Sequence, residues 1–282
     1  MPTLQLPRHN LTIGGADLCV IAGLNVLEDE GLALEVAGHL KSVTEALGLP
    51  FVFKASFDKA NRSSLDSYRG PGLDQGLKML TAVKAKHDLP IASDIHEPGQ
   101  AERASEVIDV LQIPAFLCRQ TDLIVSAAKA AKASDGWLHV KKGQFLAPLD
   151  CGNIVAKARD AIGEDRVVLC ERGVSFGYNN LVVDMLGIEQ MRGLGCPVTI
   201  DATHSVQLPG ADPRTGGKST GGRRNGVATI ACAAVAAGVD GVFLEFHPDP
   251  DKALCDGPSC LPLSSAEALL AKLKAFHRVA RQ

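Results

Sequence analysis

Residues 137–201 hold the pattern that decides the fold. The stretch opens with WLHVKK (Trp137–Lys142), and two further apolar runs follow it, VVLCER (Val167–Arg172) and VTID (Val198–Asp201). Between these runs, apolar residues in Gly152–Ala161 and Leu181–Gly193 recur with the period of an α-helix. Short strands that alternate with helices are typical of a parallel sheet, because each parallel strand needs a crossover connection.

The same alternation extends along the whole chain of 282 residues. It predicts eight strands, at Leu18–Gly23, Phe51–Ala55, Ile91–Asp94, Val107–Gln112, Trp137–Lys141, Val167–Glu171, Val198–Asp201 and Gly241–Phe246. Helices are expected at Glu28–Leu47, Leu73–His87, Gln100–Glu106, Asp122–Ala133, Gly152–Ala161, Leu181–Gly193, Gly222–Ala237 and Ser264–Arg281. Eight such units favour the α/β class and a closed (β/α)8 TIM barrel over an open doubly wound sheet. We expect one domain over residues 1–282.

Two short runs precede the repeats and predict a β-hairpin. They are Thr3–Leu6 and Leu11–Ile13, and we expect the hairpin to cap the bottom of the barrel. The segment Met1–Asn10 lacks the apolar core of a signal peptide, and no apolar run is long enough to span a membrane. We therefore expect a cytoplasmic protein that does not bind a membrane.

Composition and cysteine usage narrow the class further. The net charge of −3 gives no basis for a nucleic-acid partner. None of the eight cysteines forms a CxxC pair, and several, such as Cys19 and Cys170, lie inside apolar runs. Buried free thiols are expected rather than disulfides or a zinc site.

A polar or charged residue stands at the end of every predicted strand. These residues are Asn25, Lys54, Asp94, Gln112, Lys141, Glu171, Asp201 and Glu245. A barrel gathers all eight strand ends onto one face, where barrel enzymes keep their active sites. Strand ends are often polar simply because loops begin there, but a complete set favours a site.

Several cations are expected at the same face. They are Lys54, Lys59, Arg62, Lys141, Lys142 and Arg172. In a chain of slightly negative charge, this gathering predicts a ligand with two or three phosphate or carboxylate groups. For Lys142 and Arg119, ion pairs with surface carboxylates explain the charge equally well. The glycine-rich segment Leu208–Gly222 is expected to be a mobile lid, with an ordinary surface loop as the alternative.

Three residues at or after strand ends could hold a divalent metal. His204, Glu245 and Asp256 combine an imidazole with two carboxylates, which suits manganese, iron or zinc. Three such residues are a weak signal, and a fourth, soft ligand would strengthen it.

Eight segments together resemble one enzyme family. They are FKASFDKANRSS (Phe53–Ser64), SYRGPG (Ser67–Gly72), DIHEP (Asp94–Pro98), QIPAFLCRQTDL (Gln112–Leu123), VKKGQF (Val140–Phe145), CERGVSFGYNNLVVDM (Cys170–Met185), DATHSVQLPG (Asp201–Gly210) and FHPDPDKALCDGPS (Phe246–Ser259). Over nearly the whole chain, they resemble the 3-deoxy-D-manno-octulosonate 8-phosphate synthases, which join phosphoenolpyruvate to arabinose 5-phosphate for lipopolysaccharide synthesis. The KANRS string separates this family from the heptulosonate 7-phosphate synthases, which use erythrose 4-phosphate and carry a Lys-Pro-Arg-Thr type segment.

The resemblance implies roles for individual residues. Phosphoenolpyruvate would be held by Lys54, Ser56, Lys59, Gln112, the backbone near Ala115, Lys141 and Arg172. Asn61 and Asp94 would contact the sugar hydroxyls. Arg62 and Ser63 would bind the sugar phosphate and reach a neighbouring subunit's site, which implies a homo-oligomer, usually a tetramer.

The family has a metal-dependent and a metal-independent branch. In the metal-dependent branch, a cysteine on the first strand end completes the ligand set. Asn25 stands at that position here, and the Cys255–Gly257 string also resembles the metal-independent branch. An amide is a poor ligand for soft divalent ions, so we expect neither a metal requirement nor any cofactor.

The catalytic residues expected on this basis are Lys59, Asn25, His204, Glu245 and Asp256. Lys59 is expected to donate a proton to the developing alkoxide, because burial beside other cations lowers a lysine pKa. Asn25 and His204 would orient the aldehyde and the water, and the two carboxylates would accept the proton of the water.

Four alternatives remain at this point. A heptulosonate 7-phosphate synthase and a sialic-acid-type condensing enzyme catalyse related condensations. A Schiff-base aldolase would use Lys141 as its nucleophile. A non-catalytic barrel that senses sugar phosphates would bind its ligand without turnover.

Overall fold

The central sheet is a closed parallel barrel. The computed structural model describes residues 2–62, 64–212, 216 and 220–282. The barrel strands are β3 (Cys19–Val26), β4 (Phe51–Ser56), β5 (Ile91–Asp94), β6 (Val110–Ile113), β7 (Trp137–Lys141), β8 (Val167–Glu171), β11 (Val198–Asp201) and β14 (Gly241–His247). Each pairs in parallel with the next in this order, and β14 returns to pair with β3. The predicted (β/α)8 barrel is confirmed.

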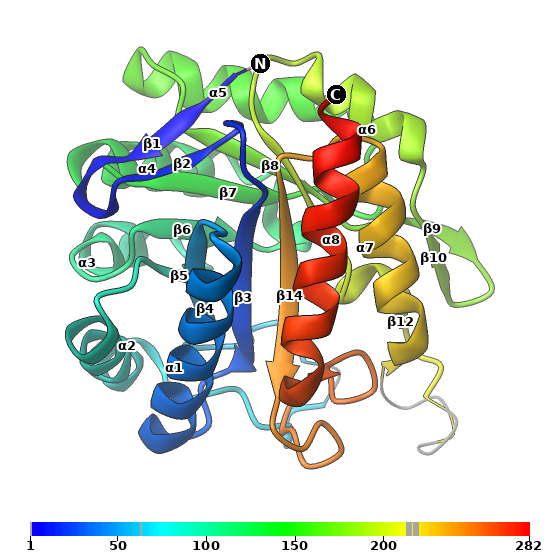
Figure 1. Ribbon diagram of the computed structural model, residues 1–282. Coiled ribbons are helices and arrows are strands. Elements are labelled where there is room, and N and C mark those ends of the chain that lie inside the picture. Colours follow the sequence, from blue (N-terminus) through cyan, green and yellow to red (C-terminus); the bar gives the residue numbers. More distant parts are fainter. Residues whose placement is uncertain (1, 63, 213–215, 217–219) are drawn as a thin grey trace.

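Helices alternate with the strands and cover the barrel. They are α1 (Glu30–Leu47), α2 (Leu73–His87), α3 (Ala101–Ser105), α4 (Thr121–Ala133), α5 (Gly152–Ile162), α6 (Met185–Arg192), α7 (Val227–Ala236) and α8 (Ala266–Ala280). Local signals set the ends of α1: Asp29 Oδ1 accepts a hydrogen bond from the Leu32 amide at 2.8 Å, and Gly48 ends the helix at a φ of 61°. In Figure 1, the paired strands β3 and β14 point their C-terminal ends toward the lower end of the view.

The opposite end of the barrel is closed by the N-terminal hairpin, as predicted. Strands β1 (Leu4–Leu6) and β2 (Leu11–Ile13) pair antiparallel. Their buried side chains join a cluster inside the barrel with residues such as Val52, Trp137 and Phe243. The Trp137 indole Nε1 also donates a hydrogen bond to the Gln5 carbonyl at 3.0 Å. The hairpin therefore seals the bottom by apolar contact, and the polar strand ends lie at the other end.

Two loops at the polar end contain strands that were not predicted. Strands β9 (Val174–Gly177) and β10 (Asn180–Val182) form a hairpin whose turn residues Tyr178 and Asn179 both have a φ of 52°. The prediction that α6 starts at Leu181 was therefore wrong, because this turn directs the chain back as a strand and Asp184 caps the helix later.

Three further boundaries or strands differ from the sequence-based assignment. Helix α7 begins at Val227 rather than Gly222, because β13 (Gly221–Gly222) pairs with β12 (Gln207–Leu208). Strand β6 begins at Val110 rather than Val107, whose amide still donates to the Ala104 carbonyl in the last turn of α3. A short strand, β15 (Leu261–Pro262), extends the sheet beside β14.

All eight cysteines are free, and seven of them are buried, as expected. Among the residues that the structure describes, no helix is both long enough and apolar enough to cross a membrane.

Candidate active site

A cavity of about 500 Å³ opens at the C-terminal ends of the strands. Its lining includes four cationic side chains, those of Lys59, Arg62, Lys141 and Arg172. His204 and Asp94 also line it. The structure thus brings most of the predicted cations to one enclosed space, which suits a ligand with several negative charges.

Two of these cations are held in place by neighbouring polar groups. Lys141 Nζ lies 2.6 Å from Asp201 Oδ2 and 3.8 Å from the centre of the Phe243 ring. Arg172 Nη2 donates to Gln207 Oε1 at 3.0 Å, and its Nη1 is buried with no partner among the residues that the structure describes. Burial lowers the pKa of Arg172 despite the nearby carboxylates. The unpaired nitrogen makes Arg172 a ready donor to an anionic oxygen.

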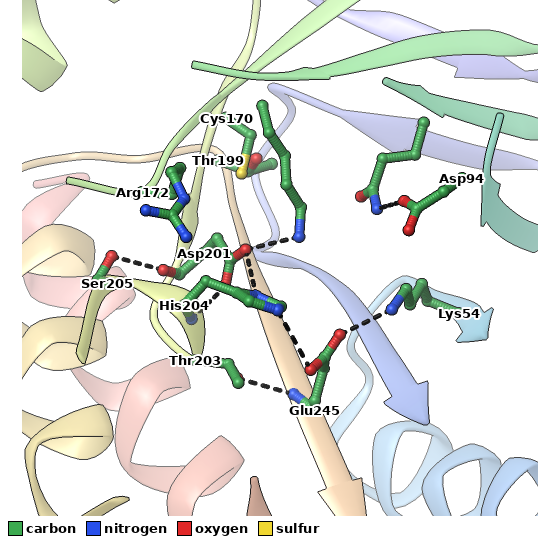
Figure 2. A network of polar contacts seen from close by, with 12 residues as sticks. Lys54, Asp94, Cys170, Arg172, Thr199, Asp201, Thr203, His204, Ser205 and Glu245 are labelled. Atoms are coloured by element: carbon green, nitrogen blue, oxygen red, sulfur yellow. Dashed lines mark hydrogen bonds and ion pairs between the residues drawn. The ribbon is translucent and has the colours of Figure 1, made fainter. Parts of the chain in front are cut away.

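Asp201 is a central residue of the site that was not among the predicted site residues. Its carboxylate is fully buried and contacts both Lys141 and His204, whose Nδ1 lies 2.7 Å from Oδ2. Figure 2 shows His204 between Asp201 and Glu245. Burial lowers the pKa of His204, but the charges of Asp201 and Glu245 outweigh it and raise that pKa above 6.5. The Asp201 position at a strand end was a sequence signal, but its partners depend on the barrel geometry.

His204, Glu245 and Asp256 do converge, and Asn25 lies with them. His204 Nε2 is 3.6 Å from Glu245 Oε2 and 3.5 Å from Asp256 Oδ2. Asn25 Nδ2 donates to the same two oxygens at 2.6 and 3.2 Å. Both carboxylates therefore already face N–H donors.

These residues do not fit a metal ion. The Asn25 amide presents its nitrogen, which is not a metal ligand, and leaves its Oδ1 buried without a partner in the described structure. Within the described ranges, no group of three or more His, Cys, Asp and Glu side chains has the arrangement to hold a metal. Asn25 and His204 instead direct N–H groups at the Glu245 and Asp256 carboxylates.

Asp256 reaches this group from an unusual backbone conformation. Its φ is 50°, in the left-handed region that few residues other than glycine adopt. The next residue is Gly257, where an added Cβ would lie 2.4 Å from the Pro250 carbonyl oxygen. The Asp256 carbonyl accepts the Ser259 amide at 2.9 Å. The tight loop after β14 thus holds the carboxylate toward His204.

Lys54 lies deeper than the resemblance implied. Its side chain is fully buried, and Nζ donates to the Leu24 and Asn25 carbonyls and, at 2.7 Å, to Glu245 Oε1. Burial lowers its pKa to about 8, although Glu245 acts in the opposite direction. All three ammonium hydrogens are thus directed at protein oxygens, so Lys54 supports Glu245 in this structure.

Lys59 belongs to a second polar group around Asp94. Lys59 Nζ lies 3.3 Å from Asp94 Oδ2, which also accepts from Ser56 Oγ at 2.7 Å, while Gln112 Nε2 donates to Oδ1. The expected lowering of the Lys59 pKa was wrong. Burial does lower it, but Asp94 and Glu245 outweigh burial, and the net effect raises that pKa.

The predicted sugar-phosphate residues lie at the rim. Asn61 and Arg62 line the cavity, and Arg62 donates to Cys255 Sγ and, at 3.4 Å, to the Leu254 carbonyl of its own chain. Ala115, which opens a short helical turn after β6, also lines it. Ser63 lies outside the described residues.

Two remaining predictions concern Lys142 and the lid. Lys142 is fully buried and lies 3.4 Å from Glu171, so its assignment to a surface ion pair was wrong. Arg119 is exposed. Part of the predicted lid Leu208–Gly222 lies outside the described residues, and its base is fixed by the pairing of β12 with β13.

Comparison with known proteins places this chain in a family. Residues 4–280 match the DAHP synthetase I family. A protein of Syntrophotalea carbinolica is 53% identical over 273 residues, covering 96% of this chain and 95% of the relative. Relatives from Trichlorobacter lovleyi and Geobacter metallireducens are 53% and 51% identical over 280 residues, covering 99% of this chain and 100% of each relative. All three are named 2-dehydro-3-deoxyphosphooctonate aldolase. This chain therefore belongs to the DAHP synthetase I family, alongside its 2-dehydro-3-deoxyphosphooctonate aldolases.

Proposed function

We propose that this protein is a transferase that condenses phosphoenolpyruvate with D-arabinose 5-phosphate and water. The products are 3-deoxy-D-manno-octulosonate 8-phosphate, used for lipopolysaccharide, and inorganic phosphate. The observation that carries this proposal is the gathering of Lys59, Arg62, Lys141 and Arg172 around one cavity. Two phosphates and a carboxylate match such a set, and the names of the relatives point to the same product.

The substrates are assigned to two ends of the cavity. Lys59, Lys141 and Arg172 hold phosphoenolpyruvate, with its phosphate on the unpaired Arg172 Nη1. Ser56 and Gln112 donate to Asp94, the partner of Lys59, and Lys54 donates to Glu245, so these three residues support the phosphoenolpyruvate end. Asn61 at the rim and the more deeply placed Asp94 contact the sugar hydroxyls, and Arg62 with Ser63 binds the sugar phosphate. Ala115 contributes its backbone to the phosphoenolpyruvate end.

The reaction forms one carbon–carbon bond and one bond from C2 to the water oxygen, and it breaks the C2–O bond to phosphate. C3 of phosphoenolpyruvate attacks the aldehyde carbon, and the aldehyde oxygen becomes a hydroxyl by gaining a proton. Water adds to C2 and loses a proton, and the C2–O bond to phosphate then breaks to leave the 2-keto acid. Holding two polyanions together requires the fixed cations of the cavity.

The pKa shifts of Lys59 and His204 suggest different catalytic roles for the two residues. Lys59, with its raised pKa, stabilises the developing alkoxide as a fixed cation. His204 has Nδ1 on Asp201 and turns Nε2 toward Glu245 and Asp256, so as an imidazolium it can supply the proton. Asp256 or Glu245 then accepts the proton of the water, and Asn25 orients both carboxylates.

The reaction is proposed to proceed without a metal or another cofactor. Lys54, His204 and the Asn25 amide already face the two carboxylates that a divalent ion would need. Asn25 provides an amide, and not a soft thiolate ligand, beside these carboxylates.

Two rival reactions fit less well. A Schiff-base aldolase needs a neutral lysine, whereas Lys141 Nζ lies 2.6 Å from the buried Asp201 carboxylate. A heptulosonate 7-phosphate synthase would carry a different segment in place of KANRS (Lys59–Ser63). Borohydride trapping with pyruvate separates the first rival, and the choice of aldehyde separates the second.

The proposed assembly is a homo-oligomer, with a tetramer as the expected form. Large apolar side chains are exposed on the segments that follow β6, β7 and β8, namely Phe116, Phe145, Leu149, Phe176, Tyr178 and Leu186. Exposed apolar side chains of this kind are what an interface with another subunit would cover, which supports the proposal. We propose one domain over residues 1–282 and a cytoplasmic location, in keeping with a biosynthetic enzyme.

The decisive experiment measures phosphate release from phosphoenolpyruvate. Arabinose 5-phosphate is the aldehyde in one arm and erythrose 4-phosphate in the other, each with and without EDTA. Turnover with arabinose 5-phosphate that survives EDTA is the expected result. Loss of activity in EDTA would overturn the metal-free proposal, and activity with erythrose 4-phosphate alone would overturn the substrate.

A further inference from the structure

A directed chain of hydrogen bonds runs from the barrel core to the cavity. His139 on β7 is fully buried and lies between Thr199 and Gln112. Its Nδ1 is 2.9 Å from Gln112 Oε1, and its Nε2 is 2.9 Å from Thr199 Oγ1. Gln112 Nε2 in turn donates to Asp94 Oδ1, and Asp94 Oδ2 contacts Lys59 at 3.3 Å.

Asp94 decides which group donates and which accepts in each of these hydrogen bonds. The Asp94 carboxylate is ionised, because the cations Lys59, Lys54 and Lys141 overcome the effect of burial and hold its pKa well below the usual value. A carboxylate only accepts hydrogen bonds, so Gln112 must turn its NH2 group toward Asp94. Its carbonyl oxygen then faces His139 and needs a donor.

Only one protonation state of the His139 ring satisfies both neighbours without a buried charge. With its proton on Nδ1, the ring donates to Gln112 Oε1, and its Nε2 accepts the Thr199 hydroxyl at 2.9 Å, a shorter contact than the 3.3 Å from that hydroxyl to the Leu169 carbonyl. Burial and Lys141 lower the pKa of this ring to about 3, so it is neutral at physiological pH. The opposite tautomer would place a lone pair against a carbonyl oxygen in a dry core, which is costly.

We infer that His139 is a positioning residue, whose Nδ1-protonated ring pairs with the Gln112 carbonyl and so holds that amide against Asp94, the partner of Lys59. The residue lines no part of the cavity, and the chain of contacts is its connection to the substrate. The effect on turnover rests on the proposed function, whereas the tautomer itself does not.

Two substitutions distinguish loss of the N–H donor to Gln112 from loss of the imidazole ring itself. His139→Asn keeps an N–H near the Nδ1 position, and His139→Gln keeps a polar group near the Nε2 position but loses the donor to Gln112. We expect His139→Gln to raise the KM for phosphoenolpyruvate about tenfold, since a buried carbonyl loses its partner. His139→Asn is expected to stay within about threefold of the native KM, because the Gln112 carbonyl keeps a donor.

Thr199→Val provides the matched control. It removes the other polar contact of the ring and leaves Gln112 with its donor. We expect it to lower the melting temperature with little change in KM. Equal KM increases in Thr199→Val and His139→Gln would mean general loosening of the core and would overturn the inference.

A direct readout avoids dependence on folding and on activity. Nitrogen-15 NMR of the histidine-labelled native protein, with His139→Asn used for assignment, is expected to show a protonated Nδ1 and an unprotonated Nε2 at neutral pH. A protonated Nε2 would overturn the inference even if turnover is normal. Absence of turnover with the correct tautomer present would instead count against the proposed function.

Discussion

Asn25 Nδ2 lies 2.6 Å from Glu245 Oε2 and 3.2 Å from Asp256 Oδ2, so one side-chain amide on β3 joins a carboxylate of the neighbouring strand β14 to one from the loop that follows β14. Together with His204, this places an N–H donor set where two carboxylates and an imidazole could otherwise hold a cation. The amide nitrogen thus donates to both acids and offsets part of the repulsion between them.

Replacing this amide with a thiol should change what the site binds. Asn25→Cys removes the donor and adds a soft ligand beside His204, Glu245 and Asp256. We expect the variant to retain a divalent metal such as manganese after dialysis, measured as metal content per chain. Asn25→Ser is the control, since it also removes the amide but provides no thiolate. Equal metal content in the native protein and Asn25→Cys would contradict this geometry.

Arg62 should act on one substrate more than on the other. Because Arg62 lies at the rim beside Leu254 and Cys255, Arg62→Ala should raise the KM for arabinose 5-phosphate at least tenfold, the loss expected for a charge-assisted contact. The KM for phosphoenolpyruvate should change much less. Arg69→Ala is the control, because Arg69 pairs with Asp58. Equal increases for both substrates would show that Arg62 is misassigned.

The pH dependence should report the Asp201–His204 pair. Asp201 raises the pKa of His204, so the imidazolium persists to a higher pH than usual and is lost as the pH rises through that value. Asp201→Asn removes this charge, and the alkaline limb of kcat should move about one pH unit lower. Asp251→Asn, which changes an exposed partner of Arg224, is the control. An unmoved limb would exclude His204 as the proton donor.

His204 and Asp256 should both be needed for turnover. We expect His204→Ala and Asp256→Ala each to lower kcat at least a hundredfold, because each removes a group that moves a proton. Rapid-quench measurement of the first turnover would separate the chemical step from product release. Rates near the native value in both variants would remove the two residues from the mechanism.

Breaking the Lys54–Glu245 pair should lower the stability of the protein. Both side chains are fully buried, and Lys54→Met leaves the Glu245 carboxylate facing one cation fewer. We expect the free energy of unfolding to fall by about 3–5 kcal/mol, measured by urea denaturation. The double variant Lys54→Met/Glu245→Gln should recover part of this loss, because the uncompensated buried charge is gone. No recovery would mean that Lys54 acts through packing alone.

The sequence by itself determined the barrel and the residues at its mouth. The alternation of apolar runs with helical periodicity reflects burial, which is encoded locally, so the eight barrel strands and the N-terminal hairpin were predictable. The strand-end positions of Lys141 and Glu245 followed from the same periodicity. The hairpin at Val174–Val182 was missed because its turn depends on two non-glycine residues with positive φ.

Only the tertiary structure decided the protonation behaviour and the partners of the site residues. Burial alone suggested that Lys59 would have a lowered pKa, but Asp94 and Glu245 come close enough to reverse that effect. Asp201 gained its role from contacts with Lys141 on another strand. The physical reason is that sign and size of an electrostatic shift depend on distances between strands that are far apart in the sequence.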